Sequence, residues 1–136
     1  MTSDRTLRWS ALAFALLFAV VIGLGYIPGA NAGHQHVGMA DTGEHSMFGL
    51  YMIGTADDVT HGLTALLLLL AAALSGAWSR LALTAFGWYY AMDAAIYLIT
   101  GFVQGKGAGP TLLLNLPHVL ISGTMLWLAY RGRPWR

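Results

Sequence analysis

Four long apolar stretches dominate this chain of 136 residues and limit what it can fold into. Hydrophobic residues make up 57% of the sequence and charged residues 10%, whereas a soluble domain carries about 25% charged residues. The stretches span residues 9–27, 56–78, 81–103 and 111–130, and each is close to the roughly 20 residues that an α-helix needs to cross a bilayer. The sequence therefore predicts one all-α domain, residues 1–136, a polytopic membrane protein built as a four-transmembrane-helix bundle.

The basic residues predict the orientation of these helices. Six of the seven are arginines that flank one end of the apolar stretches, namely Arg5, Arg8, Arg80, Arg131, Arg133 and Arg136. Cytoplasmic loops carry the excess of Lys and Arg, so four crossings put both chain ends in the cytoplasm, together with an expected tight turn at Ser79-Arg80. The net charge is +1 without a basic stripe, which argues against a nucleic-acid partner.

The first apolar stretch also has a competing interpretation. Arg5 and Arg8, the apolar run and Ala30-Asn31-Ala32 together resemble a signal peptide with an A-x-A cleavage site. The run is longer than the roughly 7–15 apolar residues of such a peptide. We therefore expect it to be a membrane-spanning helix.

The two halves of the chain share short motifs. Gly25-Tyr26-Ile27-Pro28-Gly29 ends the first stretch and Gly101-Phe102-Val103-Gln104-Gly105 ends the third. Asp58-x-x-His61 opens the second stretch, and Asn115-x-x-His118 lies near the start of the fourth. Both halves begin on the same side of the membrane, so the pattern favours two parallel helix-pair repeats, related by an axis along the membrane normal.

These motifs carry a resemblance to a known family. With Gly25-Tyr26-Ile27-Pro28, His61, Phe86-Gly87-Trp88-Tyr89-Tyr90 and Asn115-x-x-His118, the chain resembles a family of small four-span bacterial membrane proteins known only as a domain of unknown function. The resemblance covers roughly residues 10–130 and implies the four-span fold and a bacterial inner (plasma) membrane. It implies no activity.

Asp93 lies about halfway along the third apolar stretch. An ionisable side chain at that depth costs about 2.5–3.5 kcal/mol by insertion scales and usually faces a partner or a cavity. At about 1.5 Å per residue, Asp93 lies about 15 Å below the outer surface and His118 about 10 Å below it. If the last two helices are antiparallel neighbours, the two side chains can approach each other. Alternatively, Asp93 is protonated or hydrogen-bonded to Tyr89, Tyr90, Tyr97 or Thr100.

A second cluster opens the second apolar stretch. Asp57 and Asp58 lie four and three residues before His61, so either carboxylate can share a helix face with the imidazole. That arrangement suits a divalent cation. The alternative is a helix start at Thr55, where oxygen acceptors and negative charge are favoured whatever the ligand.

The outer loop, residues 28–55, is rich in histidine. His34 and His36 lie on one side of an extended strand, because side chains alternate with period two, and His45 follows. Imidazoles favour zinc, copper or nickel, and the nearby methionines Met39, Met47 and Met52 favour Cu(I). The same composition also fits a solvated polar loop. The segment from Met47 to Gly54 is apolar but short, which is typical of an interfacial or re-entrant segment.

These features lead to two main functional hypotheses. The first is a zinc- or copper-binding site on the periplasmic face, with the ligands His61, His118, His34, His36, His45, Asp58 and Asp93. The second is a non-catalytic accessory or scaffold subunit of a larger membrane complex or homo-oligomer, in which the histidines contact a haem or pigment. A minimal proton-linked transporter is a third possibility. The chain has no cysteine, no nucleophile–base pair and no phosphate-binding loop, so nothing in it indicates an enzyme.

Overall fold

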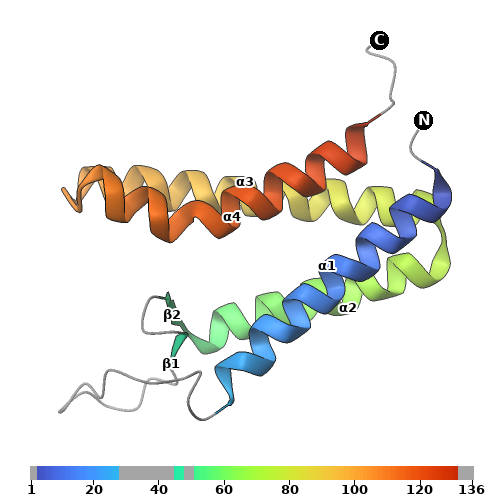
Figure 1. The fold of residues 1–136 in the computed structure, drawn as a ribbon, viewed down its shortest axis with the longest axis horizontal. Helices are drawn as coiled ribbons and strands as arrows, with labels where there is room; N and C mark the ends of the chain where they lie inside the picture. The colour runs from blue at the N-terminus through green and yellow to red at the C-terminus, as the bar shows by residue number, and fades with distance from the viewer. Residues whose placement is uncertain (1–2, 28–44, 48–50, 132–136) are drawn as a thin grey trace.

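The computed structural model describes residues 3–27, 45–47 and 51–131, and these form four helices and one short hairpin (Figure 1). The elements are α1 (Asp4–Gly25), β1 (His45–Met47), β2 (Tyr51–Ile53), α2 (Thr55–Leu74), α3 (Gly76–Val103) and α4 (Ala108–Tyr130). The predicted all-α character is confirmed. Helices α1 and α2 form one antiparallel pair, and α3 and α4 form a second pair that lies at an angle to the first (Figure 1).

The turn between α2 and α3 consists of Ser75 alone. Its side chain accepts a hydrogen bond from the Trp78 N–H at 3.3 Å and caps α3. The tight turn predicted at Ser79-Arg80 is therefore wrong, since both residues lie inside α3. The reason is local: hydropathy is continuous through this region, and only the capping serine marks where one helix stops.

The hairpin replaces part of the predicted outer loop. Strands β1 and β2 are antiparallel, with His45 opposite Ile53, and β2 leads into the start of α2 (Figure 1). The segment expected to be re-entrant or interfacial thus contains a paired strand. The histidines His34 and His36 lie outside the described residues.

The buried faces of α1 and α3 match position by position at one constant spacing along the sequence. In α1 the buried residues include Leu7, Ala11, Ala15 and Phe18, and in α3 their counterparts are Ser79, Leu83, Gly87 and Tyr90. The buried residues of α2 and α4 correspond in the same way, Leu68 with Met125 and Ala72 with Ala129. The two helix pairs therefore contribute equivalent faces to one core that all four helices share.

Two arginines repeat this correspondence. Arg8 of α1 donates from Nε to the Ala72 carbonyl of α2 at 2.7 Å, and Arg80 of α3 donates from Nη1 to the Ala129 carbonyl of α4 at 2.6 Å. Both carbonyls belong to the last turn of a helix, where backbone acceptors have no partner within the helix. Each arginine therefore closes the end of the neighbouring helix in its own half.

Three of the described helices, α1, α2 and α4, are long and apolar enough to cross a membrane. Much of their apolar surface faces outward: Val20, Leu66 and Leu70 are each about half exposed. Helix α3 is the longest, at 28 residues, but is not among the three. It contains Arg80 and Asp93, charged side chains that lower the mean hydropathy of the helix.

Candidate functional site

A group of aromatic rings from all four helices fills the middle of the core. Phe18 stacks on Tyr90 with ring centroids 5.0 Å apart, and Phe18 also stacks on His61 at 5.5 Å. Tyr90 is offset-stacked with both histidines, at 6.2 Å from His61 and 6.0 Å from His118. These spacings are typical of attractive aromatic pairs. Tyr90 of α3 therefore links a histidine of α2 to a histidine of α4.

The ring contacts follow the correspondence between the halves. Phe18 contacts His61 in the first half, and its counterpart Tyr90 contacts His118 in the second half. The one chemical difference is the hydroxyl of Tyr90, which lies 3.0 Å from the Thr64 hydroxyl in a buried hydrogen bond. That bond ties α3 to α2, and it has no equivalent at Phe18, which carries no polar atom on its side chain.

Asp93 and His118 meet across the α3–α4 interface. Their closest atoms, Asp93 Oδ2 and His118 Nε2, are 3.6 Å apart, and their side chains are 32% and 29% exposed. Asp93 lies about 15 Å before the end of α3, and His118 lies about 15 Å after the start of α4, at about 1.5 Å per residue. The two residues are level because α4 begins at Ala108, earlier than the predicted Thr111, so the depth of about 10 Å expected for His118 is too small.

Both histidines of the core keep one ring nitrogen without a protein partner. Among the described residues, His61 Nδ1 and His118 Nδ1 are buried, and neither atom has a hydrogen-bond partner. A buried polar atom left unpaired costs about 1–3 kcal/mol. Imidazole nitrogens in that condition are available to a ligand, a metal ion or a water molecule.

The two aspartates at the start of α2 have other partners. Asp57 accepts a hydrogen bond from the Gly54 backbone N–H at 3.0 Å, and so closes the first turn of α2. Asp58 accepts one from the Tyr26 hydroxyl at 2.9 Å. The helix-start interpretation therefore accounts for Asp57, and Asp58 joins the end of α1 to the start of α2.

The described part of the chain contains no group of three or more His, Asp or Glu side chains that could hold a metal ion together. Of the predicted ligands, the structure brings Asp93 and His118 together, and His61 contacts their neighbour Tyr90 without joining the pair in a group of three. The side chain of His45 and the whole of His34 and His36 lie outside what the structure describes. Comparison with protein-family models, curated proteins and solved structures finds no match to this chain.

Phe18 and Thr64 are the site residues that sequence reasoning missed. A signal for Phe18 was present, since it precedes Tyr90 by the same spacing that separates the other buried residues of α1 and α3. Thr64 follows His61 by three residues and shares its helix face. Both look like ordinary core residues until the two halves are aligned.

The Tyr26–Asp58 contact gives a prediction about pH. The pKa of Tyr26 is raised above its usual value because its hydroxyl donates to the Asp58 carboxylate and the negative charge there disfavours the phenolate. A raised pKa means that the contact stabilises the fold below about pH 10 and that this contribution is lost as pH rises through the folded-state pKa. The difference in unfolding free energy between the wild type and Tyr26→Phe should therefore shrink above about pH 10.

The measurement is the unfolding free energy of both proteins in detergent across this pH range. In an Asp58→Asn background, Tyr26→Phe should have an effect that no longer follows the same pH dependence. A difference between wild type and Tyr26→Phe that stayed constant through strong alkali would contradict the assignment.

Proposed function

We propose that this chain is a small integral membrane protein that binds zinc or cuprous copper between α3 and α4, about 15 Å from the outer ends of these helices. Membrane insertion is supported by the three apolar helices and by the side chains that they turn outward, including Val20, Leu66 and Leu70. An outward apolar surface of this extent is unusual for a soluble monomer. Lipid is the solvent that fits it.

Helix α3 is proposed as the fourth membrane-spanning helix. At about 1.5 Å per residue it is about 42 Å long, more than the roughly 30 Å of the hydrocarbon core. Its charged residues can lie within a membrane because each has a partner. Arg80 donates a hydrogen bond to the end of α4, and Asp93 faces His118. The equivalent buried faces of α1 and α3 support a pair of parallel repeats in which both helices cross in the same direction.

The proposed orientation rests on the arginines. Arg8 and Arg80 lie at the end of the bundle where α1 begins and α4 ends (Figure 1). Because positive charge is retained in the cytoplasm, both chain ends would be cytoplasmic. His61 and His118 would then lie toward the periplasmic ends of their helices.

The 3.6 Å separation of Asp93 Oδ2 and His118 Nε2 is the observation that carries the metal proposal. It is too long for a good hydrogen bond between the two atoms. A tetrahedral ion with bonds of 2.0–2.2 Å holds its ligand atoms about 3.4 Å apart. The pair is thus spaced as two ligands of one ion, and its partial exposure gives an ion access.

Further ligands are proposed from the segment that joins α1 to α2. That segment carries His34, His36 and His45, whereas His61 forms no group with Asp93 and His118 in the described part of the chain. A set dominated by imidazole with one carboxylate suits zinc, and nearby thioethers favour cuprous copper. Asp58 is left out of the proposed ligand set because it is bonded to Tyr26.

Metal binding is expected to raise the stability of the purified protein. A ligand that binds only the folded state adds about 2.7 kcal/mol at a hundred times its Kd. The measurement is thermal unfolding in neutral detergent, on protein purified without a histidine tag, with Zn²⁺ or with Cu⁺ under reducing conditions. Elemental analysis of the same preparation would give the metal content as isolated.

Substitutions distinguish the residues that bind the metal from those that do not. Asp93→Asn and His118→Ala should each lose most of the metal-induced shift, and the Asp93→Asn/His118→Ala double variant should lose all of it. Gln104→Ala, at the exposed end of α3, is the matched control and should keep the wild-type shift. No shift with either ion, or an equal shift in Asp93→Asn and wild type, would refute the metal site.

A further inference from the structure

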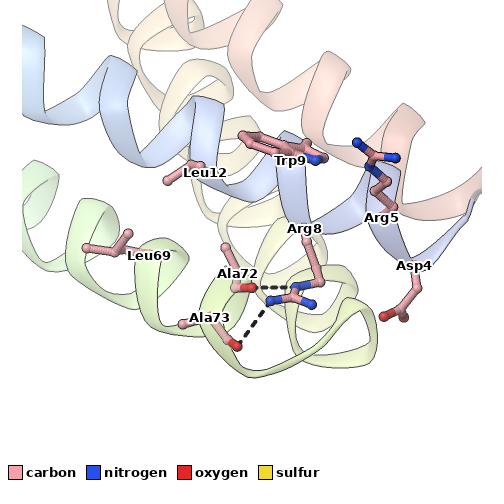
Figure 2. Close-up of a pocket in the computed structure, with 8 residues that line it drawn as sticks. All are labelled: Asp4, Arg5, Arg8, Trp9, Leu12, Leu69, Ala72 and Ala73. Carbon is pink, nitrogen blue, oxygen red and sulfur yellow. Dashed lines mark hydrogen bonds between the residues drawn. The ribbon is translucent and has the colours of Figure 1, made fainter.

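A groove of about 680 Å³ opens between the start of α1 and the end of α2, at the arginine end of the bundle (Figure 2). It is lined by Arg5, Arg8 and Trp9 near the start of α1, and by Leu12 and Leu69 farther along the two helices (Figure 2). Charged side chains thus lie at one end of the groove and apolar side chains toward the other. This division of charged and apolar surface matches the two ends of a phospholipid molecule.

Comparison of the two halves separates the groove residues that the shared fold requires from those that it does not. Arg8 closes the end of α2 through the Ala72 and Ala73 carbonyls (Figure 2), as Arg80 does for α4. Arg5 and Trp9 have no such equivalents, because Ala77 and Leu81 occupy the matching positions of α3. The first half therefore carries an additional cation and an indole ring that the shared architecture does not require.

The acidic residue of the groove is engaged elsewhere. A β-carbon built at Gly76 would overlap the carboxylate of Asp4, so this carboxylate packs against the first residue of α3. A negative charge is stabilised at the beginning of a helix, where the helix dipole is positive. The charged residues that line the groove are Arg5, Arg8 and Asp4, so its lining carries a net positive charge.

We propose that this groove binds the phosphate of an anionic phospholipid. Arg5 and the outer edge of the Arg8 guanidinium contact the phosphate, Trp9 lies at the headgroup level, and an acyl chain follows Leu12 and Leu69. Guanidinium groups match phosphate oxygens, indole rings favour the membrane interface, and basic pockets between helices on the cytoplasmic side recognise lipid headgroups. The inference rests on the proposed membrane insertion and orientation.

The test is lipid retention by the full chain in neutral detergent, followed by native mass spectrometry. Phosphatidylglycerol should be retained in preference to phosphatidylcholine at equal concentration. Arg5→Gln should weaken retention about fivefold, the effect of one interfacial basic residue, and Trp9→Leu, which installs the residue of the matching position, should weaken it as well. Neither variant removes the bond between Arg8 and α2.

Two control variants isolate the groove from general attraction to negative lipid. Arg131→Gln removes a charge at the same end of the bundle, outside the groove, and Lys106→Gln removes one at the opposite end. Both should retain phosphatidylglycerol as the wild type does. Equal losses in Arg5→Gln and Arg131→Gln would overturn the proposal in favour of unspecific electrostatics.

Two further results would also overturn it. Equal retention of phosphatidylglycerol and phosphatidylcholine would remove the headgroup specificity, and displacement of the lipid by inorganic phosphate alone would make free phosphate the ligand. Carbonate extraction of membranes tests insertion separately. A chain that stays in the membrane pellet yet shows no preference among lipids refutes only the lipid site.

Discussion

The Tyr90→Ala variant is expected to lose about 3 kcal/mol or more of its unfolding free energy. The Tyr90 ring is 2% exposed and lies against Phe18, His61 and His118, so its removal leaves a cavity at the point where all four helices meet. It also deprives the buried Thr64 hydroxyl of a partner. Reversible unfolding in mixed micelles of neutral and denaturing detergent would measure the change.

Two companion variants separate the contributions. Tyr90→Phe keeps the ring stack and removes only the hydroxyl, so it should cost about 0.5–1.5 kcal/mol. Ile96→Ala, at an outward position of α3, creates no buried cavity and should change the unfolding free energy far less. A Tyr90→Ala effect no larger than that of Ile96→Ala would show that the ring group does not hold the bundle together.

The same variants connect the fold to the proposed site. Tyr90 contacts both histidine rings, so its loss frees His61 and His118 to change rotamer. Tyr90→Phe should therefore preserve the metal-induced shift, while Tyr90→Ala should reduce it even where the protein remains folded. Loss of the Tyr90 ring would then lower the unfolding free energy through the cavity that it leaves, and weaken metal binding through the freed histidines.

Hydropathy predicted the helices of this chain well and their ends less well. The apolar stretch 56–78 was expected to be one helix, but α2 ends at Leu74 and Ser75 turns the chain. Apolar residues lie on both sides of Ser75, so the helix end depends on a single serine side chain and on close packing at Gly76. An average of hydropathy over a window of residues detects neither the serine cap nor the packing.

The pairing of Asp93 with His118 was anticipated from their predicted depths of about 15 and 10 Å, although the two residues are level only because α4 begins at Ala108. The separation of His61 from that pair could not be anticipated. Tyr90 lies against both histidines because α1 and α3 present equivalent faces to the core. That arrangement depends on the angle between the two helix pairs, which local sequence patterns do not specify.

Glycines illustrate the same limit. A glycine within a helix can permit close approach of a neighbouring helix, yet of Gly62, Gly76, Gly87 and Gly123 only two do so. A β-carbon would meet nothing within 4 Å at Gly123 and only an ordinary contact at Gly62, whereas at Gly76 and Gly87 it would overlap a neighbour. Composition identifies small residues, and only the packing separates those facing a helix from those facing outward.

Gly87→Val is expected to destabilise the bundle strongly because α3 and α4 touch at this position. A β-carbon at Gly87 would lie 2.8 Å from Leu126 Cγ and 3.2 Å from Met125 Cβ. Met125 is fully buried. Overpacking of this kind costs about 1–3 kcal/mol, and relief requires α3 and α4 to separate.

Gly123→Val is the matched control, since it puts the same β-branched residue into a helix of the same pair where the β-carbon meets nothing. The difference between the two variants in unfolding free energy therefore measures packing alone, and equal effects would show that α3 and α4 are not in close contact at Gly87. Separation of these helices would also move Asp93 away from His118. Gly87→Val should thus weaken the metal-induced shift while both proposed ligands remain in the sequence, an outcome that a metal site confined to the histidine-rich segment before α2 would not produce.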